Sequence, residues 1–129
     1  MGRVLGVDVG SKRTGFAVSD QLGITCRPLK VVRVNTVEDT VSAIISTVEE
    51  QQAETIVVGI PRPLRGGHSD QTDHTLAVVR SLSERSHVPV VSWDERFTTK
   101  MAREVTSSEK KLDAVAAAFI LQNYLDAQK

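Results

Sequence analysis

RVLGVDVGSKRTGFAVS, at residues 3–19, predicts the first two strands of the protein. Residues 3–9 form a short apolar run rich in Val, and residues 13–19 alternate small side chains with larger ones, so both runs are typical of β-strands. Only residues 10–12 separate them, which predicts an antiparallel hairpin. Asp8 interrupts the first strand, where an uncompensated buried carboxylate would cost several kcal/mol. Asp8 therefore either bonds to the turn after it or belongs to a functional site.

Three further strands follow from the hydrophobic pattern. Residues 24–34 predict a third strand, in which Pro28 suits a sheet edge or a bulge. Residues 55–60 are wholly apolar, as in a parallel strand buried on both faces. Residues 88–93 form a last short apolar strand.

Helices are predicted between and after these strands. Asn35 or Thr36 caps the first helix, and Ser69 or Asp70 opens the second. From Thr98 the chain is again typical of a helix, and residues 112–125 form the last one. Apolar residues recur at helical spacing in the first helix (Val37, Val41, Ile44, Ile45, Val48) and in the second (Leu76, Val79, Leu82).

The predicted order is three strands, a helix, a strand, a helix, a strand and a helix. Three leading strands followed by alternating units predict an α/β fold with a mixed five-stranded sheet flanked by helices. With 129 residues, we expect one domain over 1–129. No apolar run approaches the roughly 18 residues of a membrane span, and no secretory signal opens the chain. A lone Cys26 is typical of a reducing compartment, so we expect a cytoplasmic protein with no membrane partner.

The charge is balanced in total but not along the chain. The 16 basic and 16 acidic residues give zero formal net charge. Residues 1–34 hold six cations and two acids, whereas residues 35–60 hold five acids and no cation. Because electrostatic fields act within about a Debye length, one face of the protein can still be basic and bind a polyanion.

Two further acidic positions stand out beside Asp8. Asp94 and Glu95 end the last predicted strand, and since side chains alternate, one of them shares a face with Asp8 and the other does not. Asp113 opens the last predicted helix, where it either caps the helix or joins a site. If the first and last strands lie near each other, these carboxylates converge at one end of the sheet.

A convergent acidic cluster needs cations, because neighbouring carboxylates raise one another's pKa values. Oxygen ligands without Cys or His suit Mg²⁺ or Mn²⁺. Two such ions stabilise the attacking and leaving oxygens of a phosphoryl displacement, which is nuclease chemistry. Five cations are predicted near the same sheet end, where they would contact a phosphodiester backbone: Lys12, Arg13, Arg62, Arg65 and Arg96.

Four ordered blocks of this sequence resemble the YqgF type of bacterial protein, which has an RNase H-like fold, is related to Holliday-junction resolvases and is described as a nuclease of pre-16S rRNA. The resemblance covers residues 1–129 and departs from the family in a shortened segment before Asp113. The blocks are DVGSKRTG at 8–15 with AVSD at 17–20, GIP at 59–61 with Gly66, DERFTT at 94–99 with Ala102, and the elements of residues 112–125.

The resemblance implies a metal-dependent endonuclease with Asp8, the Asp94-Glu95 element and Asp113 as its acidic site. Glu95 is the preferred second metal ligand, beside Asp8 and Asp113. The implied function is hydrolysis of structured nucleic acid, above all processing of the 5′ end of precursor 16S rRNA in ribosome biogenesis, with a pre-ribosomal particle as a further partner.

Three alternatives stay open from the sequence. The same site would serve a resolvase of four-way DNA junctions, which cuts symmetrically as a dimer, and the chain itself would be a monomer or a homodimer. A non-catalytic nucleic-acid-binding factor in ribosome assembly would keep the fold without the chemistry. An actin-like or sugar-kinase ATPase shares the Asp-x-Gly hairpin but needs two such domains, for which 129 residues leave no room.

Overall fold

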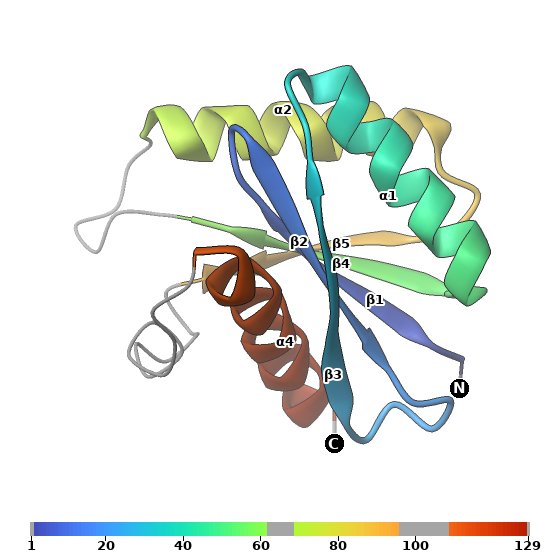
Figure 1. Ribbon diagram of the computed structural model, residues 1–129. Helices are drawn as coiled ribbons and strands as arrows, with labels where there is room; N and C mark the ends of the chain where they lie inside the picture. The colour runs from blue at the N-terminus through green and yellow to red at the C-terminus, as the bar shows by residue number, and fades with distance from the viewer. Residues whose placement is uncertain (1, 62–68, 96–108, 129) are drawn as a thin grey trace.

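The computed structural model describes residues 2–61, 69–95 and 109–128, which form one five-stranded sheet with helices on both faces (Figure 1). Strands β1 (Val4–Val9), β2 (Arg13–Ser19) and β3 (Cys26–Arg33) precede helix α1 (Val37–Gln51). Strand β4 (Thr55–Ile60), helix α2 (Asp70–Arg85), strand β5 (Val90–Asp94) and helix α4 (Glu109–Ala127) follow. The predicted order of elements is confirmed, while the predicted turn to helix at Thr98 lies outside the described residues.

The sheet is mixed, with strand order β3-β2-β1-β4-β5. β1 pairs antiparallel with β2, which confirms the predicted hairpin, and parallel with β4. β4 pairs parallel with β5. β3 lies at the sheet edge, and its pairing with β2 shifts register so that Phe16 pairs with Lys30 but Ala17 with Pro28. The edge position and the register shift are the two features that Pro28 led us to expect in this strand.

Two hydrophobic cores lie on opposite faces of the sheet. Alternate residues of β1 divide between them: Leu5 and Val7 lie in the core under α1 and α2, and Val4 lies in the core under α4. In Figure 1, α1 and α2 cover one face and α4 covers the other. Asp8 shares the α4 face with Val4 by the same alternation.

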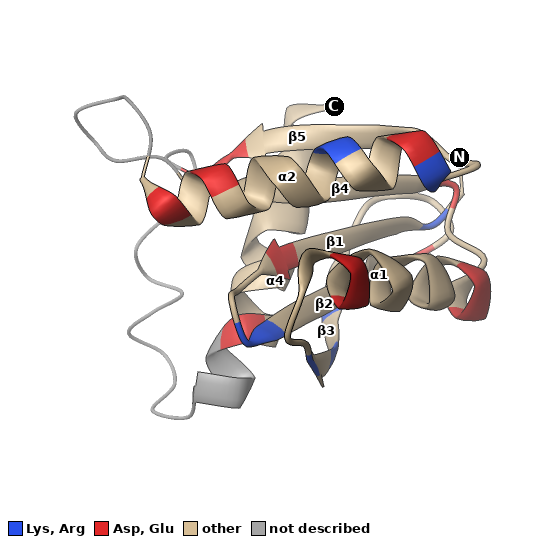
Figure 2. Ribbon diagram, turned by 90° about the horizontal axis from the view of Figure 1, so that it is seen from above, with Lys and Arg blue, Asp and Glu red and all other residues tan. Residues whose placement is uncertain are grey.

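The helices begin where short polar side chains cap them. The Thr36 hydroxyl accepts a hydrogen bond from the Asp39 amide at 3.0 Å, and the Ser69 hydroxyl accepts one from the Thr72 amide at 3.1 Å. Of the two cap candidates predicted for each helix, Thr36 and Ser69 therefore hold the position. Acidic residues gather at the start of both helices, as Figure 2 shows, where they favour the helix dipole.

The buried side of α2 differs from the predicted stripe. Thr72, Thr75, Val78 and Leu82 are buried, whereas Leu76 and Val79 are only partly buried against the core. Threonine can face the core here because its hydroxyl is satisfied locally. The Thr75 hydroxyl donates to the Gln71 carbonyl one turn earlier, and the Thr72 hydroxyl donates to the Pro61 carbonyl. Their methyl groups then pack like those of valine.

Helix α4 packs closely on the sheet at Gly15. A Cβ added to Gly15 would overlap the backbone carbonyl of Asp113, so any larger residue there would push the start of α4 away. Asp113 is thereby seated directly over β2, and Gly15 is the register partner of Asp8 on β1. The absence of one side chain thus brings two acids that are far apart in sequence to the same place.

We expect Gly15→Ala to destabilise the protein by about 1–3 kcal/mol, because the overlap is with backbone, which cannot rotate away. Urea unfolding followed by circular dichroism measures the change. Gly2→Ala is the matched control: its Cβ would meet only the flexible side chain of Glu54, so its effect should stay within about 0.5 kcal/mol. Equal stabilities for the two variants would contradict the close approach of α4.

Cys26 is the first residue of β3, and its thiol donates to the carbonyl of Ala118 on α4 at 3.2 Å. Burial, followed by the nearby charge of Asp126, raises the pKa of this thiol from its ordinary value of 9.0 to about 11. Between these two values the unfolded chain loses the thiol proton while the folded chain keeps it. Folding stability from this group is therefore complete below pH 9 and falls as the pH rises toward 11.

We expect wild-type stability to fall more steeply between pH 8.5 and 10.5 than that of Cys26→Ser. Urea unfolding at intervals across that range provides the comparison, and the serine variant carries all other titrating groups as a control. Parallel pH profiles for the two proteins would contradict the raised thiol pKa.

Candidate active site

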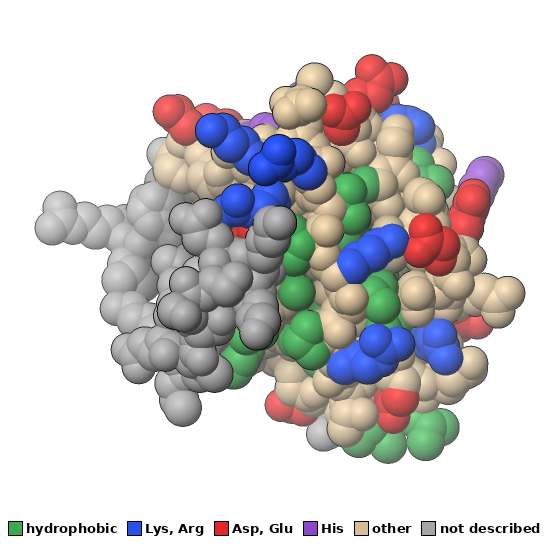
Figure 3. All heavy atoms as spheres, viewed as in Figure 1, with side chains coloured by type: hydrophobic (Ala, Val, Ile, Leu, Met, Phe, Trp, Pro, Cys, Tyr) green, Lys and Arg blue, Asp and Glu red, His purple; other side chains and the backbone are tan. Residues whose placement is uncertain are grey.

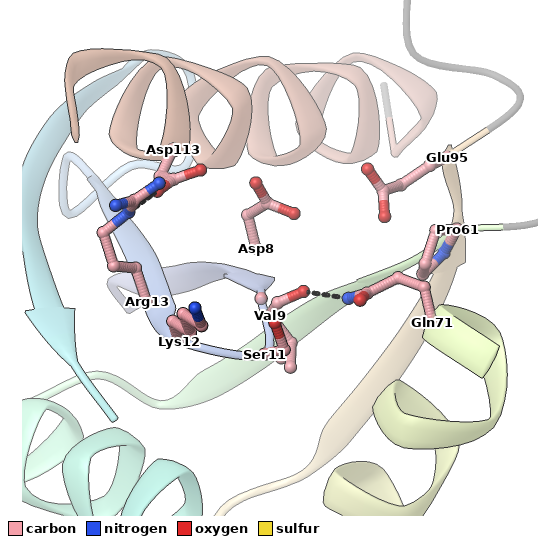
Figure 4. A pocket seen from close by; sticks show the side chains of 10 residues that line it. Asp8, Val9, Ser11, Lys12, Arg13, Pro61, Gln71, Glu95 and Asp113 are labelled. Carbon is pink, nitrogen blue, oxygen red and sulfur yellow. Dashed lines mark hydrogen bonds and ion pairs between the residues drawn. The ribbon is translucent and has the colours of Figure 1, made fainter. Parts of the chain in front are cut away.

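A pocket of about 350 Å³ opens where β1, β4 and β5 end at their carboxyl termini. This is the position at which open α/β sheets bind ligands. Figure 4 shows the pocket from close by, with α4 on one side and α2 on another. Its lining residues are Asp8, Val9, Gly10, Ser11, Lys12, Arg13, Pro61, Gln71, Glu95 and Asp113.

Asp8 occupies the centre of the pocket. It lies next to the end of β1 on the face covered by α4, and it is only partly buried. In Figure 4 its carboxylate lies between those of Asp113 and Glu95. The first strand therefore carries its acid toward an open pocket and not into the core, which resolves the anomaly of a carboxylate in an apolar strand.

Alternation along β5 decides between Asp94 and Glu95. Asp94 is the register partner of Ile60, whose side chain lies in the core under α1 and α2, so Asp94 points to that side. Trp93 packs in the core under α4. Glu95 returns to the α4 side, close to Gly59, and lines the pocket. Asp94 is not among the lining residues.

Asp113 is a pocket residue and not a helix cap. Helix α4 begins at Glu109, so Asp113 lies beyond the first turn, where a side chain cannot cap the free backbone amides. Its carboxylate Oδ2 accepts a hydrogen bond from Arg13 Nε at 3.0 Å, and both side chains are about a quarter exposed. The ion pair thus connects the start of β2 to α4, and both of its residues line the pocket.

Two of the five predicted substrate-binding cations lie at this site. Lys12 is exposed in the turn between β1 and β2, and Arg13 follows it at the start of β2. Figure 3 shows a group of basic side chains near the top of one face of the molecule. The Lys12 and Arg33 side chains are both exposed. The remaining three, Arg62, Arg65 and Arg96, lie outside the described residues.

Gln71 is a pocket residue that the sequence analysis missed. Its side-chain amide donates to the carbonyl of Val9 at 2.7 Å, which fixes the first turn of α2 against the end of β1. A polar residue in the first turn of a helix that follows a parallel strand returns to the same sheet end as that strand. The position of Gln71 at the start of the helix after β4 could therefore have identified it, together with Pro61, as a pocket residue.

The donor set matches the chemistry of a hard divalent cation. Three of the lining residues are carboxylates, and none is Cys or His. Within residues 2–61, 69–95 and 109–128, no group of three His, Cys, Asp or Glu side chains is gathered so as to hold an ion by itself. Mg²⁺ does not need such a cage, because it commonly keeps several waters and binds one or two carboxylates together with substrate phosphate. The pocket therefore fits an ion that is completed by solvent and substrate.

The structure of RuvC from Thermus thermophilus matches this chain with a TM-score of 0.62 over 98% of this chain and 96% of that one, at 17% sequence identity. The protein therefore has the fold of the RNase H-like resolvases. This confirms the predicted α/β architecture.

Residues 2–127 match the family described as "RuvX: Holliday junction resolvase", and the chain belongs to this family of nucleases. A "Putative pre-16S rRNA nuclease" from Desulforamulus reducens is 35% identical and covers 97% of each chain. One of the same name from Syntrophus aciditrophicus is 38% identical and covers 97% of this chain and 89% of the relative. The predicted resemblance and the prediction of a hydrolase acting on nucleic acid are confirmed. Nucleases of this fold generally use divalent metals.

We expect Glu95→Gln to weaken Mn²⁺ binding at least about tenfold, because it removes one anionic oxygen donor from the pocket. Asp94→Asn is the matched control, since it neutralises the neighbouring acid on the opposite face of β5. Isothermal calorimetry with Mn²⁺ compares both with the wild type. A larger loss in Asp94→Asn than in Glu95→Gln would contradict the assignment of faces.

Proposed function

We propose that this chain is a Mg²⁺- or Mn²⁺-dependent endonuclease whose substrate is precursor 16S rRNA and whose active site is the pocket around Asp8. The observation that carries the proposal is the convergence of Asp8, Glu95 and Asp113 with Lys12 and Arg13 around one cavity. The names of the curated relatives support the choice of substrate. Such a function belongs to the cytoplasm and to a pre-ribosomal particle. No helix in the described part of the chain is long and apolar enough to cross a membrane.

Asp8, Glu95 and Asp113 are the residues that would hold the ions, and the Asp8 carboxylate lies between those of the other two acids (Figure 4). When bound, divalent ions supply an activated water and stabilise the attacking and leaving oxygens of an in-line displacement. Asp8 comes from β1, a strand with a paired neighbour on each side, so its backbone is held in place by the sheet.

Lys12 and Arg13 would position the nucleic acid, and Gln71 would position Asp8. Lys12 and Arg13 border the pocket on the side of the β1–β2 turn, where phosphates of a bound strand would meet them. Such contacts carry no sequence information, and they suit a substrate recognised by its shape. Gln71 holds the carbonyl end of β1 in place and so keeps Asp8 at the pocket floor.

A four-way DNA junction is the second candidate substrate. The description of the matching family favours it, and the chemistry of the pocket is the same for either phosphodiester. A resolvase of this kind needs two copies of the chain to cut symmetrically, whereas trimming of an RNA end needs only one.

We expect Asp8→Asn to lower metal-dependent cleavage of a structured precursor 16S rRNA fragment at least about 100-fold, because the central anionic donor is lost. Wild type and variant are compared on that RNA and on a synthetic four-way DNA junction, in Mg²⁺ and in Mn²⁺. Glu84→Gln, in the exposed last turns of α2, is the control and should cleave like the wild type.

The substrates separate the two candidates. Faster cleavage of the RNA supports the proposal, and symmetric cleavage of the junction without cleavage of the RNA favours the resolvase. Undiminished RNA cleavage by Asp8→Asn, with unchanged circular dichroism, would overturn the assignment of the active site.

A further inference from the structure

Arg13 and Asp113 form an ion pair within the pocket itself. Arg13 Nε lies 3.0 Å from Asp113 Oδ2, and only about a quarter of either side chain is exposed to solvent. Both residues line the cavity. The pair joins β2 to α4 across 100 residues of sequence. A partly buried pair of this kind is screened less by water and salt than one on the open surface.

This ion pair competes with the site that the proposed function requires. While Asp113 Oδ2 accepts from Arg13, the guanidinium places a positive charge beside that oxygen, and this charge would repel a divalent cation at the same carboxylate. Within the described residues, no three His, Cys, Asp or Glu side chains are placed so as to hold an ion by themselves.

The neighbourhood of Arg13 opposes its release into solvent. Arg33 is its register partner on β3, and like charges directly opposite each other on a sheet repel. The Asp113 carboxylate offsets that repulsion. A phosphate diester can replace Asp113 as the anion paired with Arg13, because it fits the planar fork of guanidinium donors.

We propose that Arg13 couples nucleic-acid binding to metal binding by exchanging Asp113 for a phosphate of the substrate. Without nucleic acid, Arg13 holds Asp113. With nucleic acid in the pocket, Arg13 pairs with a backbone phosphate and leaves the Asp113 carboxylate to an ion. The inference rests on the proposed function and adds that the complete metal site forms only on the substrate, so that the free protein is held in a less competent state.

Coupling of this kind is reciprocal. If nucleic acid strengthens metal binding by some factor, metal strengthens nucleic-acid binding by the same factor, and typical couplings are about 5- to 150-fold. Lys12 offers a matched control, because it lines the same pocket and carries the same charge but is an exposed residue of the turn.

The first measurement is calorimetry with Mn²⁺ alone. We expect Arg13→Gln to bind Mn²⁺ at least about fivefold more tightly than the wild type, because the competitor for Asp113 is gone. Lys12→Gln removes one positive charge from the pocket and should change the affinity less. Unchanged or weaker Mn²⁺ binding by Arg13→Gln would show that Arg13 only positions Asp113, and would overturn the inference.

The second measurement is the affinity for a fluorescein-labelled RNA hairpin, by anisotropy, with and without Ca²⁺ in place of Mn²⁺ to slow cleavage. We expect Ca²⁺ to tighten binding by the wild type and by Lys12→Gln about fivefold or more, and to leave Arg13→Gln nearly unaffected. Equal effects of Ca²⁺ in all three proteins overturn the inference alone. Absence of metal-dependent cleavage of the precursor 16S rRNA fragment by the wild type overturns the proposed function together with it.

Discussion

The contact of helix α4 with Gly15 is the constraint on which the site depends. The missing side chain lets the backbone of Asp113 rest directly on β2, and the register of the hairpin puts Asp8 beside Gly15 on β1. Glu95 reaches the same pocket from the end of β5 near Gly59, another position without a side chain. Asp8, Glu95 and Asp113 therefore line one pocket because Gly15 and Gly59 have no side chains to keep them apart.

Bringing acids together in this way creates a charge problem that the protein meets with cations of its own. Arg13 sits against Asp113, and Lys12 lies beside it in the turn. These are also the groups that a phosphate backbone would contact. In the proposed function, this one small region neutralises the acids in the free protein and binds the polyanion when the substrate enters.

Much of the fold followed from hydrophobic periodicity, because the strands between residues 4 and 60 are bounded by clear turns and filled by Val and Ile. The choice between Asp94 and Glu95 could not be made that way. It depends on the phase of β5 in the sheet, and one residue of slip exchanges the two faces. The role of Asp113 was equally open, because it depended on where the helix begins, and α4 begins at Glu109, three residues before the predicted start at residue 112.

The Arg13–Asp113 ion pair and the hydrogen bond from Gln71 to Val9 could not be predicted from the sequence, for a different reason. Each joins elements whose separation is set by tertiary packing, and no local pattern encodes the distance. The buried threonines of α2 belong with them, because their polarity hides the fact that each hydroxyl is satisfied: that of Thr75 by the Gln71 carbonyl one turn earlier, and that of Thr72 by the Pro61 carbonyl.

The edge strand β3 also bears on how the protein behaves in a crowded cell. Its pairing slips between Lys30 and Pro28, proline offers no amide to a new neighbour, and Arg27, Lys30 and Arg33 add positive charge along the strand. An edge built this way resists the addition of another strand, so self-pairing of two copies through β3 is disfavoured. Growth of the sheet is therefore opposed on the side of the hairpin, whereas β5, the edge strand on the other side, has no proline to oppose it.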